Sequence, residues 1–345
     1  MTTLHHLSQL LDQADCEFTI YDLGRRVTLI PNALFRAVEE NRQPYPYPLR
    51  QHAQIAVVFR KQQEEAPFLW LLKFPLDERG LLKAAPVGDF IRYVAEAMGK
   101  QLTAPLTEDE QQALASNPYL FKPSEDKLAI LHAKLRCELG QAPTHFYAAA
   151  SEYFTAESDK TQWQQLGIQG LADIATRLNQ DNNTTKIRAA LAKLPDAPRY
   201  ALLGCLEHVD LPASLAQRLA DDLNLALSST TADSQHIAAL IRALAGAPKA
   251  MLQQQLQQLL QHPLVNVDDV LVAIAGRCWH GLDDDTLLAY LLKLAKNGNQ
   301  GLFNALFADL VAIPALRCHI LPLLHQPLPE KLQLALQEMQ AGLQH

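Results

Sequence analysis

The chain has 345 residues, of which 30 are lysine or arginine and 37 are aspartate or glutamate, giving a formal net charge of -7. Hydrophobic residues make up 48% of the chain and charged residues 19%, which excludes wholesale disorder because enough apolar surface can be buried to offset the cost of ordering. The negative net charge offers no overall attraction to a phosphate backbone or an anionic bilayer, so nucleic acid and membranes are disfavoured as partners.

The cysteines and the first residues indicate the compartment. Five cysteines stand far apart without a CxxC spacing, so neither a disulfide framework nor a conventional zinc site is predicted. The first residues lack a signal-peptide pattern, and polar residues break every apolar run before the roughly 18 residues needed to cross a bilayer. We therefore expect a cytoplasmic protein, and no motif predicts a cofactor.

Strand-forming patterns are confined to the first hundred residues, where β-branched and aromatic residues gather between turn signals. Two runs, 54–59 and 68–74, flank a polar hairpin loop and are apolar at consecutive positions, so helices should cover both faces of the pair. The predicted elements, in chain order, are a helix over 4–14, edge strands over 18–21 and 27–30, a short helix from Asn32, the strand pair, and a helix over 87–98 ended by Gly99. This pattern predicts an α+β module with a small, mostly antiparallel sheet.

From about Thr107 onward the pattern becomes helical, because leucine and alanine recur every three or four residues between proline, glycine and aspartate breakers. Thr107–Glu110 has the form of a capping box, and Ser124 marks the start of a helix ending near Gly140. We predict an α+β module over 1–104, connecting helices over 105–160 and a helical repeat domain over 161–345.

Internal similarity supports a repeat. Leu271–Cys278 is echoed by Leu310–Cys318, with looser echoes at 203–206 and 240–246. The spacing lies near or slightly below that of HEAT and armadillo units, so a HEAT/armadillo-like solenoid is predicted. The alternative is a set of unrelated amphipathic helices with chance echoes. Prolines fall near the predicted helix starts, where their missing N–H costs nothing; they are Pro198, Pro212, Pro263, Pro314 and Pro329.

Mixed charges at the ends of two predicted strands form the best candidate polar site. Arginines there could clamp a carboxylate or phosphate, and an acidic side chain could act as a counter-charge or general base. The alternative is that the nearby glycines permit turns and that the charges solvate these turns or pair across the module. The candidate residues are Asp22, Arg25, Arg26, Asp77, Glu78 and Arg79.

The segment Pro44–Pro48 alternates proline with tyrosine and should be extended and stiff. Tyr45 and Tyr47 are therefore candidate contacts for a partner. The alternative is a rigid connection whose tyrosines fold back onto their own domain.

Two further groupings are interpreted as structural. Cys278 with His280, and Cys318 with His319, resemble halves of a metal site, but adjacent residues on a helix point about 100° apart, so no metal site is predicted. The run Asp283–Asp285 lacks the glycine and distal glutamate of a calcium loop and favours the N-terminus of a helix.

Four segments together resemble an uncharacterised family of gammaproteobacterial proteins that carries a domain-of-unknown-function label. They are Tyr21–Arg26, Pro44–Pro48, Phe68–Leu82 and Tyr93–Gly99. The similar total length implies that the resemblance spans the chain, and it implies a bacterial origin. Since the family has no assigned activity, the resemblance implies no catalytic or binding residue.

We therefore expect a non-catalytic protein that binds a protein partner through a helical-repeat surface, because no set of nucleophile, base and orienting residue can be assembled. The alternative is a hydrolase or phosphate-handling enzyme that uses Asp77 or Glu78 as acid or base and Arg25 and Arg26 as anion clamps.

Overall fold

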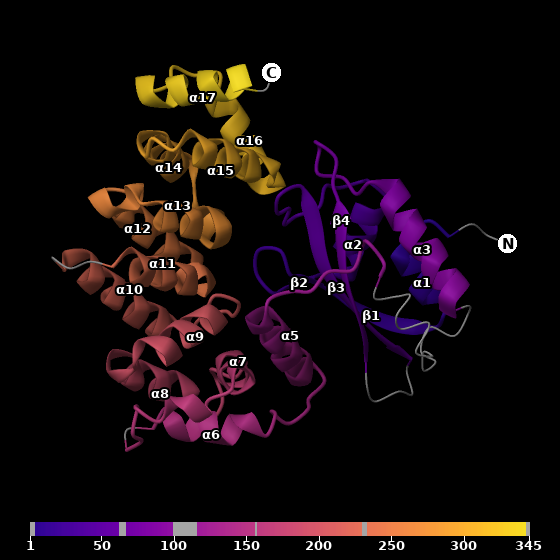
Figure 1. Cartoon of the computed structure of the whole chain (residues 1–345), viewed down its shortest axis with the longest axis horizontal. Helices are drawn as coiled ribbons and strands as arrows, with labels where there is room; N and C mark the ends of the chain where they lie inside the picture. Colours follow the sequence, from indigo (N-terminus) through magenta and orange to yellow (C-terminus); the bar gives the residue numbers. More distant parts are fainter. Residues whose placement is uncertain (1–3, 62–66, 99–115, 156, 230–232, 343–345) are drawn as a thin grey trace. The chain divides into compact units, whose positions relative to one another are not determined.

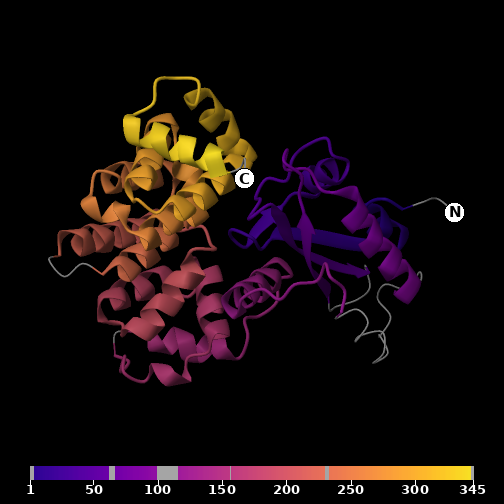
Figure 2. The ribbon, with the colours of Figure 1, turned by 45° about the horizontal axis from the view of Figure 1, so that its top comes forward.

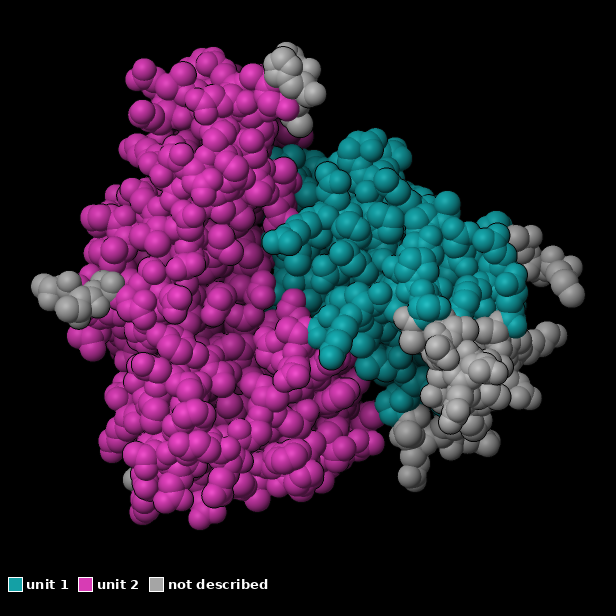
Figure 3. Space-filling model, in the orientation of Figure 1, with its two compact units in different colours: residues 1–123, 311–317 teal, residues 124–310, 318–345 magenta. Residues whose placement is uncertain are grey.

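A computed structural model describes residues 4–61, 67–98, 116–155, 157–229 and 233–342. The chain forms two compact units (Figure 3): unit 1 comprises Met1–Pro123 and Val311–Arg317, and unit 2 comprises Ser124–Leu310 and Cys318–His345. The predicted capping box at Thr107–Glu110, the helix stop at Gly99 and most of the hairpin loop at 60–67 lie outside the described residues.

Unit 1 is an α+β module built on a four-stranded antiparallel sheet in the order β2-β1-β3-β4. Figure 1 shows α1 and α3 on one side of this sheet. The elements of unit 1 are α1 (Leu7–Gln13), β1 (Cys16–Asp22), β2 (Thr28–Ile30), α2 (Asn32–Glu39), β3 (His52–Lys61), β4 (Phe68–Pro75) and α3 (Ala84–Met98). The predicted antiparallel module is therefore confirmed, with helix bounds that differ by up to three residues.

The core of unit 1 lies between one face of the sheet and the three helices. Register places Ile20 opposite Val57 and Val57 opposite Trp70, so these side chains point to the same face. The apolar stripes of the helices, including Leu11, Phe35 and Phe90, pack against them in one buried cluster. Burial of this shared face is the main force that holds strands from distant parts of the sequence together.

Two details of the sheet differ from the sequence-based expectation. The run 18–21 belongs to β1, which pairs with both β2 and β3 and is an inner strand, not an edge strand. On β4 the second face is only half-buried at Leu69 and Leu71. The outer side of β4 is not free, because the amide of Lys73 donates to the carbonyl oxygen of Tyr119 at 2.8 Å and the amide of Phe121 donates to that of Leu71 at 3.1 Å.

Unit 2 is helical throughout its described residues (Figures 1 and 2). Its α-helices are α5 (Glu125–Glu138), α6 (Phe146–Tyr153), α7 (Ile168–Thr176), α8 (Asn183–Ala190), α9 (Asp196–Leu206), α10 (Ala213–Ser228), α11 (Ser234–Ala243), α12 (Lys249–Leu259), α13 (Asp268–Ala273), α14 (Asp284–Lys296), α15 (Gln300–Ala312), α16 (Pro314–Leu323) and α17 (Glu330–Gly342). The end of α15 and the start of α16, Val311–Arg317, are counted with unit 1. Short 3-10 turns are η1 (Trp163–Gln165), η2 (Leu191–Lys193), η3 (Leu244–Gly246), η4 (Pro263–Asn266) and η6 (Trp279–Gly281), and η5 (Ile274–Cys278) is a π-helix. Helices α5 and α6 pack on α7 and so belong to this unit.

Alternate helices of unit 2 stack in chain order, since α7 packs on α9, α9 on α11 and α11 on α13. The looser echoes at 203–206 and 240–246 lie on α9 and on α11 with η3, next to Leu271–Cys278 on α13 and η5. In contrast, Leu310–Cys318 spans the end of α15 and the start of α16, which are bent by 116°. That closer echo therefore has no counterpart in structure.

Helix boundaries follow the predicted local signals. The side chain of Asp283 accepts from the amide of Thr286 at 3.0 Å, and the hydroxyl of Thr286 accepts from the amide of Asp283 at 2.8 Å, which is a capping box at α14. Ser124 is the N-cap residue of α5, and Gly140 adopts a positive φ of 64° just after that helix. The Asp283 box satisfies amides that the start of α14 would leave unpaired, whereas the Ser124 side chain makes no cap hydrogen bond at α5.

Among the described helices, no single one is long and apolar enough to cross a bilayer. The bent pair α15 and α16 passes the same test of length and composition when taken together.

The crossing of α6 and α7 requires a glycine. A Cβ on Gly170 would lie 2.8 Å from the carbonyl oxygen of Phe146 and 3.1 Å from the Cβ of Ala150. We expect Gly170→Ala to lower the free energy of unfolding by about 2 kcal/mol, because overpacking against backbone exceeds the gain in helix propensity of about 1 kcal/mol. Urea denaturation measures this, and Gly204→Ala in α9 is the control.

At Gly204 an added Cβ meets nothing within 4 Å. The control should therefore raise the free energy of unfolding by up to about 1 kcal/mol. Equal effects of the two alanines would show that α6 and α7 are not held at this distance.

Candidate functional site

Asp22 is a buried acceptor at the end of β1. Its side chain is 1% exposed. Its Oδ1 accepts from the Tyr45 hydroxyl at 2.7 Å and from the amide of Gly24 at 3.2 Å, and its Oδ2 accepts from the amide of Arg25 at 3.0 Å. The carboxylate thus closes the turn after β1 and ties it to the proline-rich segment.

Arg25 is also buried, at 1% exposure. Its Nε donates to the carbonyl oxygen of Pro48 at 2.9 Å. The guanidinium therefore holds the backbone of Pro44–Pro48 from inside unit 1. Arg26, the next residue, is half-buried.

The two tyrosines fold toward their own unit. Tyr45 is 1% exposed and Tyr47 is half-buried, and their rings meet edge to face with centroids 6.4 Å apart. The amide of Tyr45 donates to the carbonyl oxygen of Gly80 at 2.8 Å. Burial, followed by the nearby Asp22 carboxylate, raises the pKa of Tyr45 well above its ordinary value, so its hydroxyl remains a donor.

We expect Tyr45→Phe to lower the free energy of unfolding by about 1.5–2 kcal/mol, because it removes one hydrogen bond to a buried carboxylate and leaves the ring in place. Chemical denaturation measures the loss. Tyr119→Phe is the control, since the Tyr119 hydroxyl bonds the exposed Asp89 at 3.4 Å. A loss at Tyr45 no larger than at Tyr119 would contradict a structural role for the Asp22 bond.

The second candidate loop is a turn organised by Asp77. Its Oδ1 accepts from the amides of Arg79 at 2.9 Å and Leu81 at 2.8 Å. Its Oδ2 lies 3.3 Å from Nε of Arg79. Slight burial raises the pKa of Asp77, but the hydrogen bonds from Leu81 and Arg79 outweigh it and hold that pKa below its ordinary value. A carboxylate of lowered pKa is a weak proton acceptor at neutral pH.

Glu78 and Arg79 at the tip of this turn are exposed, and Gly80 adopts a positive φ of 83°. The Tyr45–Gly80 bond joins this turn to the proline-rich segment, which in turn contacts the Asp22 loop. The structure thus links the two predicted loops through Pro44–Pro48. Asp22, Arg25 and Asp77 each hold a loop in place.

A pocket in unit 1 is lined by residues that belong to none of the sequence motifs described above. It has a volume of about 380 Å³. Its polar lining residues are His5, His6, Glu39, Glu40 and Asn41, and its apolar lining residues are Leu82, Ala84, Val87 and Gly88. The adjacent pairs His5-His6 and Glu39-Glu40 are the sequence signal that could have pointed here.

Glu39 is the central polar group of this pocket. It is 6% exposed, and its carboxylate accepts from the amide of Leu7 at 2.6 Å and from that of Ser8 at 3.2 Å. The last residue of α2 therefore caps α1, whose own N-cap residue His6 makes no side-chain cap. Burial raises the pKa of Glu39 to about 7, against the lowering effect of the hydrogen bonds from Ser8 and Leu7.

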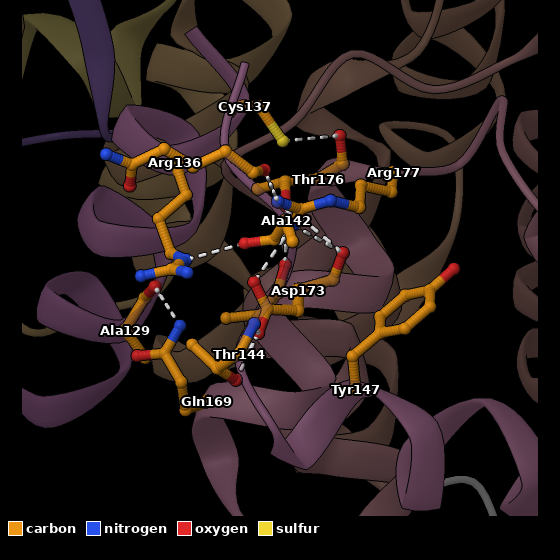
Figure 4. A network of polar contacts seen from close by, with 12 residues as sticks. Ala129, Arg136, Cys137, Ala142, Thr144, Tyr147, Gln169, Asp173, Thr176 and Arg177 are labelled. Carbon is orange, nitrogen blue, oxygen red and sulfur yellow. Dashed lines mark hydrogen bonds and ion pairs between the residues drawn. The ribbon is translucent and has the colours of Figure 1, made fainter. Parts of the chain in front are cut away.

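Unit 2 contains a buried ion pair inside a polar network (Figure 4). Asp173 and Arg177, one turn apart on and just after α7, are 0% and 3% exposed and lie 2.9 Å apart. Oδ2 of Asp173 also accepts from the amide and hydroxyl of Thr144 at 3.0 and 2.5 Å. The network fixes the loop between α5 and α6 onto α7.

A second group of charged residues joins three of the stacked helical segments of unit 2. Glu207, 4% exposed, ends α9; its Oε1 lies 2.7 Å from Nε of Arg277 and its Oε2 lies 3.3 Å from Nε of Arg242. The three residues follow one another at intervals of 35 positions and come from three stacked helical segments. Arg277 belongs to the π-helix η5, an insertion that is frequent at functional sites.

The residues that resembled halves of a metal site have other contacts. Sγ of Cys278 lies 3.1 Å from the carbonyl oxygen of Ile241, while Cys318 is exposed and Nδ1 of His319 lies 2.6 Å from Asp284. Within the described ranges, no three histidine, cysteine or acidic residues are grouped so that they could hold a metal ion.

Comparison of the chain with known proteins identified a matching protein family. No curated protein and no solved structure matched the chain. A family match extends from residue 2 to residue 340 and so covers nearly the whole chain. It includes all four segments on which the resemblance rested. The chain therefore belongs to the family described as "Protein of unknown function (DUF3549)".

Proposed function

We propose that the protein is a non-catalytic interaction protein whose unit 2, a helical repeat of the HEAT or armadillo type, binds a protein partner through its exposed surface. The observation that carries the proposal is the stacking of α7, α9, α11 and α13, with Glu207, Arg242 and Arg277 at equivalent intervals. Stacked repeats offer side chains in register over a long surface, which is how such proteins recognise partners.

The composition of that surface supports binding of a protein. Leu225 on α10 is 72% exposed and Val272 on α13 is 45% exposed, each on a helix whose remaining exposed residues are mostly polar. Exposed apolar residues surrounded by polar ones are typical of interaction sites. All five cysteines are free thiols, which supports a reducing compartment such as the cytoplasm as the place of action.

The roles of the candidate polar residues favour this proposal over a hydrolase or phosphate-handling enzyme. Arg25 is buried against Pro48, and Asp77 is held by hydrogen bonds within its own turn. Neither lines the 380 Å³ pocket of unit 1. An anion clamp and a general base both need access to a substrate.

The test is affinity capture with the full chain from a native lysate, followed by reconstitution with the purified partner. We expect a stoichiometric protein partner whose affinity falls at least about tenfold in Leu225→Glu or in Val272→Glu, since a buried unpaired charge costs more than 1.4 kcal/mol. Gln333→Glu, an exposed polar position on α17, is the control for added charge away from both apolar positions.

Two results would contradict the proposal. One is the absence of any partner whose binding depends on either apolar position. The other is turnover of an ester or phosphate ester by the pure protein that Glu78→Gln or Asp77→Asn abolishes.

A further inference from the structure

The pocket of unit 1 has the size and two-sided lining of a small-ligand site. Its volume of about 380 Å³ lies within the roughly 300–1,000 Å³ of such sites. The segments before α1 and at the end of α2 contribute carboxylates, imidazoles and an amide, and the segment 82–88 contributes the apolar lining residues. A ligand that fills it must therefore combine a polar head with a short apolar stem.

Glu39 determines the sign of the charge that the polar head of a ligand should carry. It is buried, yet no described lysine, arginine or histidine forms an ion pair with it. Arg36, one turn earlier, donates to both carboxylate oxygens of Asp12 at 2.7 and 2.9 Å, and Glu40 pairs with Arg42. The amides of Leu7 and Ser8 satisfy part of the Glu39 carboxylate but bring no positive charge. The charge of Arg36 lowers the pKa of Glu39, but Arg36 forms no ion pair with it. A buried carboxylate without a paired cation favours a ligand that carries one.

The apolar side distinguishes an organic cation from an inorganic one. Leu82 and Val87 are buried apolar residues beside the pocket. At Gly88, in the first turns of α3, an added Cβ would meet nothing within 4 Å, so the helix backbone there is open to the pocket. A hydrated metal ion gains no binding free energy from apolar lining residues, whereas a hydrocarbon stem buries its apolar surface against them.

We infer that this pocket binds a small organic cation, with an ammonium group paired to the Glu39 carboxylate and an apolar stem packed against Leu82 and Val87. Glu40 and Asn41 on the same side offer further oxygen acceptors to the ammonium. All residues that line the pocket belong to unit 1, so this inference does not rest on the function proposed for unit 2.

Binding should strengthen with pH, because the ammonium pairs with the ionised form of Glu39. Burial holds the pKa of that group near 7, so binding near neutral pH displaces a proton from the carboxyl group. The other titratable groups nearby are His5 and His6 before α1, and Arg36 and Glu40 on and after α2. The part of α3 that lines the pocket contributes no titratable side chain.

The experiment uses the full chain and n-butylammonium chloride as the probe, with binding measured by calorimetry and by backbone NMR shifts at pH 6 and pH 8. We expect saturable binding that is tighter at pH 8, with shifts at Leu7, Ser8 and Gly88. Glu39→Gln keeps an acceptor for the α1 amides but removes the charge, and should weaken binding at pH 8 by at least about tenfold. Gly88→Leu fills the pocket and should do the same while leaving Glu39 intact.

Controls separate charge, stem and general surface effects. Glu17→Gln removes an exposed carboxylate on β1, and Ala95→Leu places the same leucine side chain on the exposed part of α3; both should bind within about twofold of the parent chain. Butanol and butyrate should not bind. Equal responses to sodium chloride at matched concentration, equal binding by the Gly88→Leu chain, or no saturable binding at pH 8 would each overturn the inference.

Discussion

Replacing Asp173 by alanine should lower the free energy of unfolding by about 3–5 kcal/mol, measured by urea denaturation at pH 7. The substitution leaves the guanidinium of Arg177, which is 3% exposed, buried without its carboxylate. It also removes the acceptor for the amide and hydroxyl of Thr144. A buried charge that loses its partner costs several kcal/mol because desolvation is no longer offset.

The matched control is Asp196→Ala, which breaks the pair between Asp196 and Arg199 on α9. The Asp196 side chain is 77% exposed, so this change should cost no more than about 1 kcal/mol. The double variant Asp173→Ala with Arg177→Met leaves no unpaired charge. Its loss in free energy of unfolding should therefore be about 2 kcal/mol smaller than the sum of the losses in the two single variants. Additive losses, or a loss at Asp173 as small as at Asp196, would show that the pair is not buried.

The second large effect concerns pH. As the pH rises from 4 to 8, the free energy of unfolding of the parent chain should fall by about 3 kcal/mol more than that of the Glu39→Gln chain. Each unit of difference between the folded and unfolded pKa corresponds to about 1.4 kcal/mol. The ordinary pKa is 4.5 and the folded value is about 7. Between these values the unfolded chain has lost the proton and the folded chain keeps it. Rising pH therefore favours unfolding over this interval, and the effect levels off above pH 7.

The comparison must be made as a difference between the two chains. Asp77 and Asp283 have pKa values below the ordinary range, so they stabilise the fold as pH rises and act in the opposite direction. They contribute equally to both chains and cancel. Parallel pH profiles for the parent and Glu39→Gln chains would contradict a buried, uncompensated carboxyl at the pocket, and would remove one support of the proposed cation site.

The Asp173 network and the helix stack are connected. Helix α7 is the first of the helices that stack as α7, α9, α11 and α13, and the network fixes the loop before α6 onto it. Gly170 on the same helix allows α6 to approach its backbone closely. If unit 2 binds a partner through repeated positions, the polar network holds one end of that surface in register.

Local signals in the sequence predicted individual elements well. The strand pair β3 and β4, the helix beginning after Ser124 and the cap at Asp283 all depend on residues within a few positions of one another. Side-chain periodicity and capping act over one or two turns, so the sequence itself contains this information. The change from an α+β module to helices is likewise a change of local composition.

Local sequence signals could not predict the order of the strands or the partners of the buried polar groups. Whether 18–21 forms an inner or an edge strand depends on pairing with β3, some forty residues away. The closest of the three internal echoes, at Leu310–Cys318, has no structural counterpart because a bend between α15 and α16 interrupts it.

The candidate site likewise has features that the sequence predicts and features that depend on the tertiary structure. The sequence by itself determined that Asp22, Arg25 and Asp77 stand in turns beside strands and that the chain has a sheet module followed by helices. Only the tertiary structure decided that Arg25 points inward to Pro48, and that Glu39 caps a helix from 32 residues away beside a pocket. Charge and hydrogen-bonding capacity are properties of a residue, but burial and pairing depend on which distant segments pack against it, because desolvation is set by the whole surrounding fold.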